Sequence, residues 1–388
     1  MKKFDAGKES LVLHKKARGK IEVVGKVPVR NRKELSVAYT PGIGAVSSAV
    51  AANPELAFSH TIKGNTVAVV SDGSAVLGLG NLGALGALPV MEGKALLFKQ
   101  FAGVDAFPIC LDTQDTEEII RTVKAIAPSF GGINLEDISA PRCFEVERRL
   151  RAELSIPVMH DDQHGTATVV LAGLINALKL RKTKKESAKV VINGAGAAGT
   201  SIAKILVDYG FKYVVLCDSK GVVTRERGDI NKEKEELVSY IEVKAGAYYG
   251  KNGTLMDALV GVDIFVGVSK AGALTPEMVQ VMAPKPIIFG LANPVPEIMP
   301  DIAKKAGAFV VATGRSDFPN QLNNVLAFPG LFRGALDARV QFEPSVFVRA
   351  AEAIAKSVKK LTVDTIIPDP FDVSVPKRVA QAVKKGKK

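Results

Sequence analysis

The chain has 388 residues, 47% of them hydrophobic and 24% charged, and a formal net charge of +12. This length favours two domains, because single cores stop growing at roughly 250–300 residues, and the composition is that of a soluble globular protein. We find neither an apolar run of about 20 residues nor a signal peptide, so we expect a cytoplasmic protein without a membrane partner. The basic excess is spread out and lacks interleaved aromatic residues, which argues against nucleic acid and for weak attraction of anionic small molecules.

The first quarter of the chain offers two candidate catalytic side chains. An apolar segment over residues 35–44 ends in a Pro-Gly turn and presents Tyr39, a residue type that usually serves packing. A valine-rich strand over 65–73 is followed by closely spaced glycines, and residues 91–101 read as a helix that carries Lys94. A lysine on a helix is usually solvated, but the apolar neighbours of Lys94 indicate burial.

Paired acids follow two predicted strands. Residues 132–135 form a strand that delivers Glu136 and Asp137, and residues 156–160 form a strand that delivers Asp161 and Asp162. Ligands gather at the carboxyl ends of strands in open α/β sheets, and four crowded carboxylates repel one another unless a cation or a shared proton intervenes. Carboxylate oxygens without cysteine suit a hard cation, so we expect Mg²⁺ or Mn²⁺.

A dinucleotide fingerprint follows. The strand 189–193 runs into a glycine-rich loop and a helix, and the next strand ends at Asp218. This order is typical of a Rossmann site, in which the acidic residue accepts from a ribose 2′-hydroxyl and disfavours a 2′-phosphate. We therefore expect NAD, with NADP possible because Lys220 follows closely. The predicted cofactor-binding residues are Gly194, Gly196, Ala197, Ala198, Gly199, Asp218 and Asn293.

Further βα units at 263–269 and 287–294 complete this second sheet, and an apolar helical pattern from residue 325 to about 361 should pack back on the first domain. We thus predict an α/β fold with an N-terminal substrate and metal domain over 1–160, a Rossmann domain over 161–324 and a C-terminal helical segment over 325–388.

A nucleotide domain beside an acidic metal site narrows the chemistry to oxidation of a metal-chelating hydroxy acid. If the substrate is a β-carboxylate, oxidation yields a β-keto acid, and a cation on the new carbonyl supports loss of CO₂. Two alternatives remain open from the residues alone: a metal-dependent dehydrogenase that stops at the keto acid, and a non-catalytic nucleotide sensor.

Six ordered motifs resemble those of the malic enzymes in their short microbial form. These are Ala38-Tyr39-Thr40-Pro41-Gly42, Gly78-Leu79-Gly80-Asn81-Leu82-Gly83, Leu135-Glu136-Asp137, the run from His160 to Ala167, Leu291-Ala292-Asn293-Pro294 and Asn323-Asn324-Val325. The resemblance implies oxidative decarboxylation of malate to pyruvate and CO₂ with NAD(P)⁺ and a divalent cation. It also implies a homodimer or a higher homo-oligomer.

The resemblance also implies residue roles. Tyr39 would be the general acid, Lys94 the general base and Asp161 its orienting partner; Glu136, Asp137 and Asp162 would bind the metal; Asn293 and Asn324 would contact substrate. A lysine that acts as a base at neutral pH needs a lowered pKa, which we expect burial near the cation to provide. One departure is that Ser74-Ala75-Val76 stands where larger members carry a substrate-carboxylate arginine.

Overall fold

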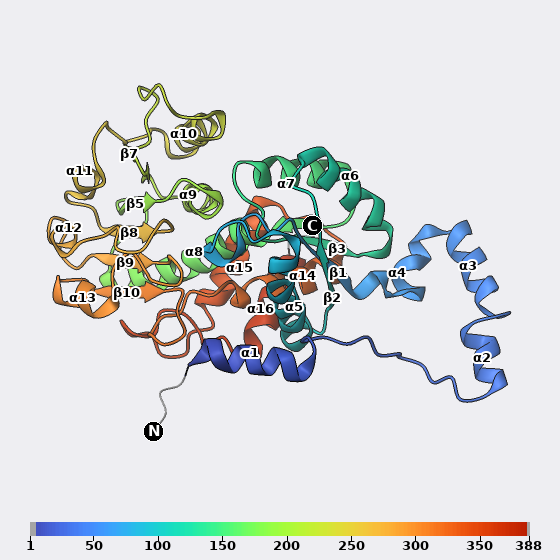
Figure 1. The fold of residues 1–388 in the computed structure, drawn as a ribbon. Helices are drawn as coiled ribbons and strands as arrows, with labels where there is room; N and C mark the ends of the chain where they lie inside the picture. Colours follow the sequence, from blue (N-terminus) through green and yellow to red (C-terminus); the bar gives the residue numbers. More distant parts are fainter. Residues whose placement is uncertain (1–4, 386–388) are drawn as a thin grey trace.

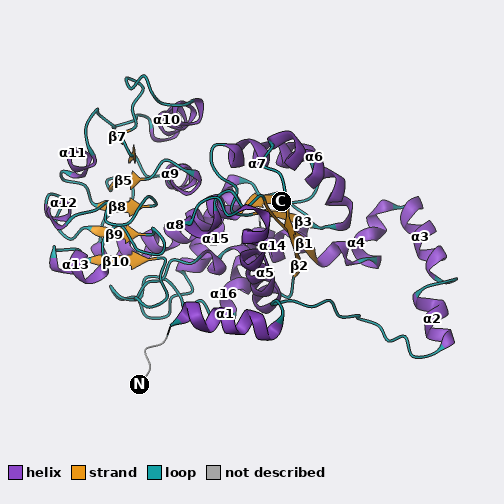
Figure 2. Ribbon diagram, viewed as in Figure 1, coloured by secondary structure: helices purple, strands orange, loops and turns teal. Residues whose placement is uncertain are grey.

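The protein is described from a computed structural model that covers residues 5–385. Two β-sheets, one parallel and one mostly parallel, are each covered by helices, lie side by side and are joined by a long central helix (Figures 1 and 2). The α/β class predicted from the sequence is confirmed.

The first sheet has four parallel strands in the order β2 (Asp105–Cys110), β1 (Thr66–Ser71), β3 (Gly132–Leu135) and β4 (Val158–His160). Every residue of β1 is buried, because it is a central strand with helices on both faces. The covering helices are α5 (Gly83–Ala102), α6 (Thr116–Ile126) and α7 (Arg142–Glu153). The helix that we predicted from residue 91 therefore begins eight residues earlier, in the glycine-rich segment.

The second sheet has six strands in the order β10 (Val310–Thr313), β9 (Ile287–Gly290), β8 (Ile264–Gly267), β5 (Lys189–Asn193), β6 (Tyr213–Asp218) and β7 (Gly221–Val222). Only β7 runs antiparallel to its neighbour among these described strands. The chain leaves β5 first toward β6 and later toward β8, so the switch point lies between β5 and β8. Its helices are α9 (Ala197–Tyr209), α10 (Lys232–Ala245), α11 (Leu255–Leu259), α12 (Pro276–Gln280) and α13 (Pro300–Lys305).

Helix α8 (Asp161–Arg181) connects the two sheets, and 15 of its 21 residues are buried. It packs against α9 on one side and against the C-terminal helix α15 (Pro344–Ala355) on another. Because the helix is enclosed, its sequence is apolar all round and shows no single hydrophobic stripe. Its first turn, which carries Asp161 and Asp162, is thereby fixed between the two sheets.

The C-terminal helices return to the first domain, as predicted. Helix α14 (Phe328–Ala338) packs on α5, where Phe98 lies 4.7 Å from the ring of Phe328 and 5.4 Å from that of Phe332. Helix α16 (Ser374–Lys384) packs on α14 and α15. Because α15 also contacts α8 and α9, the C-terminal segment covers both domains.

The N-terminal helices α1 (Ala6–Ala17), α2 (Arg32–Ala38), α3 (Ile43–Ala52) and α4 (Ala57–His60) contain no buried residue. Figure 1 shows α2 and α3 extending far from both sheets. The stretch Arg32–Ala52 is long and apolar enough to cross a membrane by length and composition alone, which is weak evidence for a span. Short 3₁₀ turns occur at Pro54–Leu56, Ile62–Asn65, Val76–Gly78, Ala127–Ser129 and Asn324–Leu326.

Candidate active site

The two acidic pairs meet at the carboxyl edge of the first sheet. Strands β3 and β4 are parallel neighbours, with Leu135 opposite His160, so the residues that follow them emerge together. The backbone N–H of Asp137 donates to Asp162 Oδ2 at 2.9 Å, which ties the two strand ends to each other. The expectation that both pairs gather at one edge is confirmed.

Three of these carboxylates are arranged to hold a cation. Each of Glu136, Asp137 and Asp162 offers an oxygen that lies within 4.8 Å of the others. Glu136 and Asp137 are buried, and Asp137 Oδ2 has no hydrogen-bond partner among residues 5–385. A buried acceptor left unpaired is costly, so an all-oxygen, mostly dry cluster of this kind fits a hard divalent cation.

The carboxylates shift one another's protonation. Burial raises the pKa of Asp137 to about 7, and repulsion from Asp162 acts in the same direction. Burial also raises the pKa of Glu136 well above its ordinary value; Lys94 opposes that rise, but Asp162, Asp161 and Asp137 add to it. A divalent cation would relieve this repulsion, because it stabilises the charged forms.

Lys94 lies inside this cluster, with only 7% of its surface exposed. Its Nζ lies 2.5 Å from Asp161 Oδ2 and 2.9 Å from Glu136 Oε1, and 4.2 Å from the ring centre of Phe328. Burial alone would lower the pKa of Lys94, but the two carboxylates outweigh burial and raise it. The expected burial is confirmed. The lowered pKa that we expect for Lys94 beside a bound cation stays a prediction, because the raised pKa applies to the protein groups alone.

Asp161 joins three distant parts of the chain. It is fully buried, and its Oδ2 accepts from Lys94 on α5 and, at 2.5 Å, from Asn324 Nδ2, just before α14. A side chain at Gly165, one turn along α8, would place a Cβ 1.9 Å from Asp161 Oδ1. The glycine after His164 is therefore required by the close packing of this carboxylate.

A second layer behind the acids was missed from the sequence. Buried Glu147 on α7 accepts from the backbone N–H of His160 at 3.1 Å, and its carboxylate lies 2.9 Å from His164 Nε2. The ring of His164 stacks on Phe347 at 4.4 Å, which holds this histidine in place. Glu147 could have been suspected only from its place on the buried side of α7, since a lone Glu in a charged helix is normally solvated.

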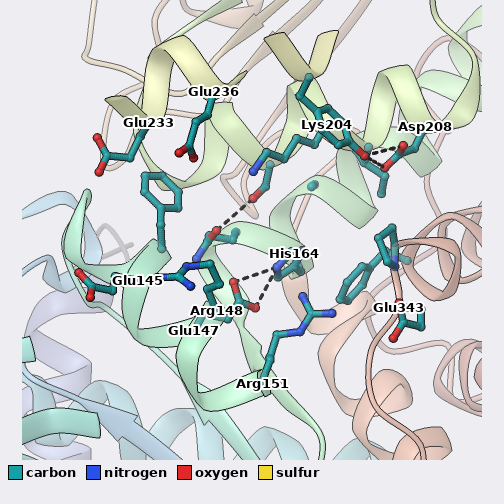
Figure 3. Close-up of a pocket in the computed structure, with 18 of the residues that line it drawn as sticks. Glu145, Glu147, Arg148, Arg151, His164, Lys204, Asp208, Glu233, Glu236 and Glu343 are labelled. Carbon is teal, nitrogen blue, oxygen red and sulfur yellow. Dashed lines mark hydrogen bonds and ion pairs between the residues drawn. The ribbon is translucent and has the colours of Figure 1, made fainter. Parts of the chain in front are cut away.

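A cavity of about 780 Å³ opens on the far side of this layer, between α7, α9 and α15 (Figure 3). Glu147 and His164 form one wall, and Lys204 lines the opposite wall. None of the three candidate metal ligands lines it, so this cavity is separate from the acid cluster.

The loop after β1, where the family arginine is absent, is closed by internal hydrogen bonds. Ser74 Oγ donates to Asp72 Oδ1 at 2.6 Å and accepts from the backbone N–H of Ser139 at 2.9 Å. Arg142 on α7 donates to the other oxygen of Asp72 at 2.8 Å. The arginine of this region therefore comes from α7, and it is already paired with a buried aspartate.

Tyr39 is not brought to the other candidate residues. It caps the C-terminus of α2 in the extended N-terminal region, and 67% of its surface is exposed. Its side chain makes no hydrogen bond with any residue that the structure describes. Within one chain, Tyr39 and Lys94 thus lie in separate parts of the molecule (Figure 1).

The nucleotide loop has the geometry that the fingerprint requires. A side chain at Gly194 would meet Val268 O at 2.4 Å, and one at Gly199 would meet Gly194 O at 1.7 Å, whereas Gly196 faces open space. Helix α9 begins at Ala197 without a side-chain cap, so the N–H groups of its first turn remain available for a pyrophosphate. These residues fit a dinucleotide, as predicted.

The carboxylate of Asp218 is already hydrogen-bonded within the protein, which the fingerprint alone did not indicate. Its carboxylate accepts from Lys220 N at 2.9 Å, from Arg227 at 2.8 and 3.2 Å and from Lys234 Nζ at 2.6 Å. Burial would raise the pKa of Asp218, but the hydrogen bonds from Arg227 and Lys234 prevail and lower it to about 2. A carboxylate with four donors has little capacity left for a ribose hydroxyl.

Asn293 lies exposed at the end of β9, on the edge that faces the first domain. A Cβ at Gly78 would lie 3.1 Å from Asn293 O, and one at Gly314 would lie 3.4 Å from its side-chain oxygen. Asn293 therefore borders both the glycine-rich loop of the first domain and the end of β10, between the acids and the nucleotide loop.

Comparison with known families gives two adjoining matches. Residues 18–151 match the family described as "Malic enzyme, N-terminal domain", and residues 163–386 match "Malic enzyme, NAD binding domain". Together these cover almost all of the chain.

Individual relatives agree with the family match. The chain is 55% identical over 382 residues to the bifunctional malic/malolactic enzyme of Bacillus subtilis, covering 97% of this chain and 92% of that protein. It is 45% identical to an NADP-dependent malic enzyme of Rhizobium meliloti, covering 97% of this chain and 51% of that longer protein. The crystal structure of the NAD-dependent malic enzyme of Thermotoga maritima superimposes with a TM-score of 0.92 at 50% identity, covering 98% of this chain and 99% of that one.

The raised pKa of Asp137 predicts a pH-dependent stability in protein freed of divalent cations by a chelator. The pKa of Asp137 is about 7 in the folded protein and about 3.9 in the unfolded chain. Protonation of Asp137 therefore stabilises the folded state fully below about pH 4, and this stabilisation is lost as the pH rises through about 7. Between about pH 5 and about pH 8, the melting temperature of Asp137→Asn should therefore rise relative to that of the unaltered protein.

The control is Asp317→Asn. Asp317 is an exposed residue whose pKa is lowered by the hydrogen bond from Arg315, so its charge does not change over this range. A difference in melting temperature between Asp137→Asn and the unaltered protein that stays constant with pH would contradict the prediction.

Proposed function

The chain belongs to the malic enzyme family, and on that premise we propose which of its residues carry out each part of the reaction. It catalyses the oxidative decarboxylation of malate to pyruvate and CO₂ with reduction of NAD(P)⁺. The observation that carries the residue assignment is the buried lysine within a cluster of four carboxylates, at the sheet edge nearest the nucleotide loop.

Glu136, Asp137 and Asp162 are the proposed ligands of Mg²⁺ or Mn²⁺. Their oxygens converge, and the pKa values of Glu136 and Asp137 are raised even though Lys94 lies beside them. A cation held by these residues would supply Lewis-acid polarisation of the malate oxygens, and a bound NAD(P)⁺ would supply the hydride acceptor. The protein's own contribution is to keep these acids in place and to exclude water from them.

Lys94 is the proposed base for the malate hydroxyl, and Asp161 and Asn324 are proposed to orient it. Asp161 Oδ2 accepts hydrogen bonds from both Lys94 and Asn324, so the position of the lysine depends on the residues just before α14 as well as on α5. If Glu136 ligated a cation, its carboxylate would stabilise the charged form of Lys94 less, and burial would then lower the lysine pKa toward the range of a base. Asn293, at the border of the two domains, is the proposed further contact to substrate and cofactor.

Asp162→Ala tests the metal assignment. Removing one of three anionic ligands should abolish malate oxidation, while the affinity for NAD⁺ in the absence of malate should stay within about twofold, because the nucleotide loop belongs to the other sheet. Asp317→Asn serves as a control for loss of an acid elsewhere on the surface. Normal turnover by Asp162→Ala at ordinary Mn²⁺ concentration would reject the assignment.

Tyr39 is proposed to act in the site of a second copy, which makes the functional unit a homodimer. Residues 21–31 leave the body next to α5, where Lys20 N donates to Glu92 at 3.0 Å and Lys20 Nζ to Pro89 O at 2.8 Å. Extended chain of that length spans up to about 35 Å, enough to reach a neighbouring subunit. The arm formed by residues 21–60 thus carries Tyr39 away from its own site.

Complementary apolar surfaces favour this arrangement. The arm exposes Val37, Tyr39 and Ile43, and the loop beside the metal ligands exposes Leu77 and Leu79. Leu77 N lies 3.4 Å from Asp137 Oδ1, so that loop borders the site. Two exposed apolar surfaces on one soluble chain are most simply covered by a two-fold partner, with each arm placed on the other copy. The apolar stretch Arg32–Ala52 described above also lies in this arm.

Complementation between two inactive variants tests the exchange. Tyr39→Phe and Lys94→Ala, produced together at equal levels, should regain about a quarter of normal activity, because half of the dimers are mixed and one of their two sites is intact. As a control, Lys94→Ala with Asp162→Ala should regain none, since both residues come from the same body. No recovery by the first pair in dimers shown to be mixed would mean that Tyr39 does not act across the interface.

The setting of Asp218 affects the choice of cofactor. Lys220, Arg227 and Lys234 surround Asp218 and Asp229, so this group carries a net charge of +1. Repulsion of a 2′-phosphate by Asp218 is therefore largely offset, and the relatives include both NAD-dependent and NADP-dependent malic enzymes. We keep NAD as the preferred cofactor, with a small preference and with NADP accepted.

Cofactor preference should move in opposite directions in two variants. Asp218→Ser frees Arg227 and Lys234 and should raise the NADP⁺/NAD⁺ ratio of kcat/KM about tenfold, while Lys234→Gln should lower it by a similar factor. Lys232→Gln, on the same exposed helix start, should leave the ratio unchanged. An unaltered ratio in both Asp218→Ser and Lys234→Gln would show that this group does not read the 2′-position.

The remaining assignments concern organisation. The divisions 1–160, 161–324 and 325–388 place each sheet in its own domain, with α8 beginning at the boundary. The proposed location is the cytoplasm, and the proposed partners are malate, pyruvate and the dinucleotide.

A further inference from the structure

Glu297 is a buried acid that none of the roles above uses. It follows β9 in the loop that begins with Asn293, its exposed fraction is 0%, and it forms no ion pair with any residue between 5 and 385. Burying a carboxylate without a cation costs free energy of folding unless hydrogen bonds replace its hydration. The presence of a buried Glu297 therefore needs an explanation.

Three donors from two loops satisfy this carboxylate. Oε1 accepts from the Ser269 backbone N–H at 2.8 Å and from Ser269 Oγ at 3.3 Å, and Oε2 accepts from the Ala292 N–H at 3.0 Å. Ser269 follows β8 and Ala292 follows β9. One side chain therefore holds together the ends of two adjacent strands.

The connection extends to a third strand. Asn193, the last residue of β5, donates from Nδ2 to Ser269 Oγ at 3.0 Å. The hydroxyl of Ser269 thus accepts a hydrogen bond from Asn193 and donates one to Glu297, so the hydrogen bonds run in one direction from β5 to the carboxylate behind β9. This chain of hydrogen bonds crosses the switch point of the sheet, beneath the crevice where a dinucleotide lies in such folds.

The ends of both strands are shaped to admit the carboxylate. Gly267 ends β8, and a Cβ there would lie 2.4 Å from Glu297 Cδ; Gly290 ends β9, and a Cβ there would lie 3.5 Å from Glu297 Oε2. Any side chain at residue 267 would displace the acid, whereas a Cβ at residue 290 would only touch it. The glycine that ends β8 is thus required by this carboxylate.

The order of the strands indicates which half of a bound dinucleotide lies near Glu297. The glycine loop after β5 is the proposed pyrophosphate site, and Asp218 at the end of β6 lies on the adenosine side. A dinucleotide bound in an extended form across the switch point therefore places its nicotinamide half over the loops after β8 and β9.

We propose that Glu297 is a positioning residue for the nicotinamide half of the NAD(P) site: it fixes the loops at Ser269 and Ala292 and, through Ala292, the backbone of Asn293. The proposal rests on the proposed function only in placing Asn293 at the reacting end of the cofactor. Glu297 itself is shielded from solvent and need not touch the cofactor.

Binding of the whole cofactor and of its adenosine part tests the role. Glu297→Gln keeps the shape but places an NH₂ group against one of the N–H donors, so one loop loses its anchor. By calorimetry without malate or metal, we expect the Kd of NAD⁺ to rise about tenfold and the Kd of ADP-ribose to stay within about twofold. A purely structural role would change both affinities together.

Two further variants make the result decisive. Ser269→Ala removes only the hydroxyl link and should give the same selective loss at a smaller size, which covers the case in which Glu297→Gln does not fold. Glu277→Gln, an exposed acid on the neighbouring α12, should change neither affinity. Equal loss of NAD⁺ and ADP-ribose, or no loss of either, would overturn the proposal. Because turnover is not measured, a failure here is distinct from a failure of the metal and lysine assignments.

Discussion

Mutual repulsion among four carboxylates around one lysine is the constraint on which the rest of the site depends. Glu136, Asp137, Asp161 and Asp162 cannot all be ionised in a mostly dry space with one positive charge from Lys94. The protein therefore either retains protons on these acids or takes up a cation. The need for a divalent metal is in this sense a property of the fold, because the acids are placed by adjacent strand ends and cannot move apart.

The lysine and the acids are held by elements from three regions of the chain. Lys94 comes from α5, Asp161 begins α8, and Asn324 precedes α14. Lys94 and Asn324 both donate a hydrogen bond to the same oxygen of Asp161. Helix α8 is also the helix against which α9 of the nucleotide domain packs. Its first turn, which carries Asp161 and Asp162, is therefore held in place by both domains.

The sequence predicted the elements and the acid cluster because both depend on local patterns. Strand ends that carry Glu136, Asp137, Asp161 and Asp162 follow from apolar runs and their neighbours, and the nucleotide loop follows from glycine spacing. Three features could not be predicted in this way, since each depends on partners distant in sequence. The saturation of Asp218 by Arg227 and Lys234, the raised pKa of Lys94 and the position of Tyr39 on an extended arm are all of this kind. Glu297 is the clearest omission, because nothing in its local sequence distinguishes it from a solvated loop acid.

Calorimetric titration of Mn²⁺ into chelator-treated protein, in two buffers of different protonation enthalpy at about pH 7, tests the carboxylate cluster most directly. We expect one cation per chain and a net release of protons, because the pKa values of Glu136 and Asp137 are raised and metal ligation requires their charged forms. Heats that show no saturable site, or binding with no proton release in either buffer, would contradict the conclusion that these crowded acids form the metal site.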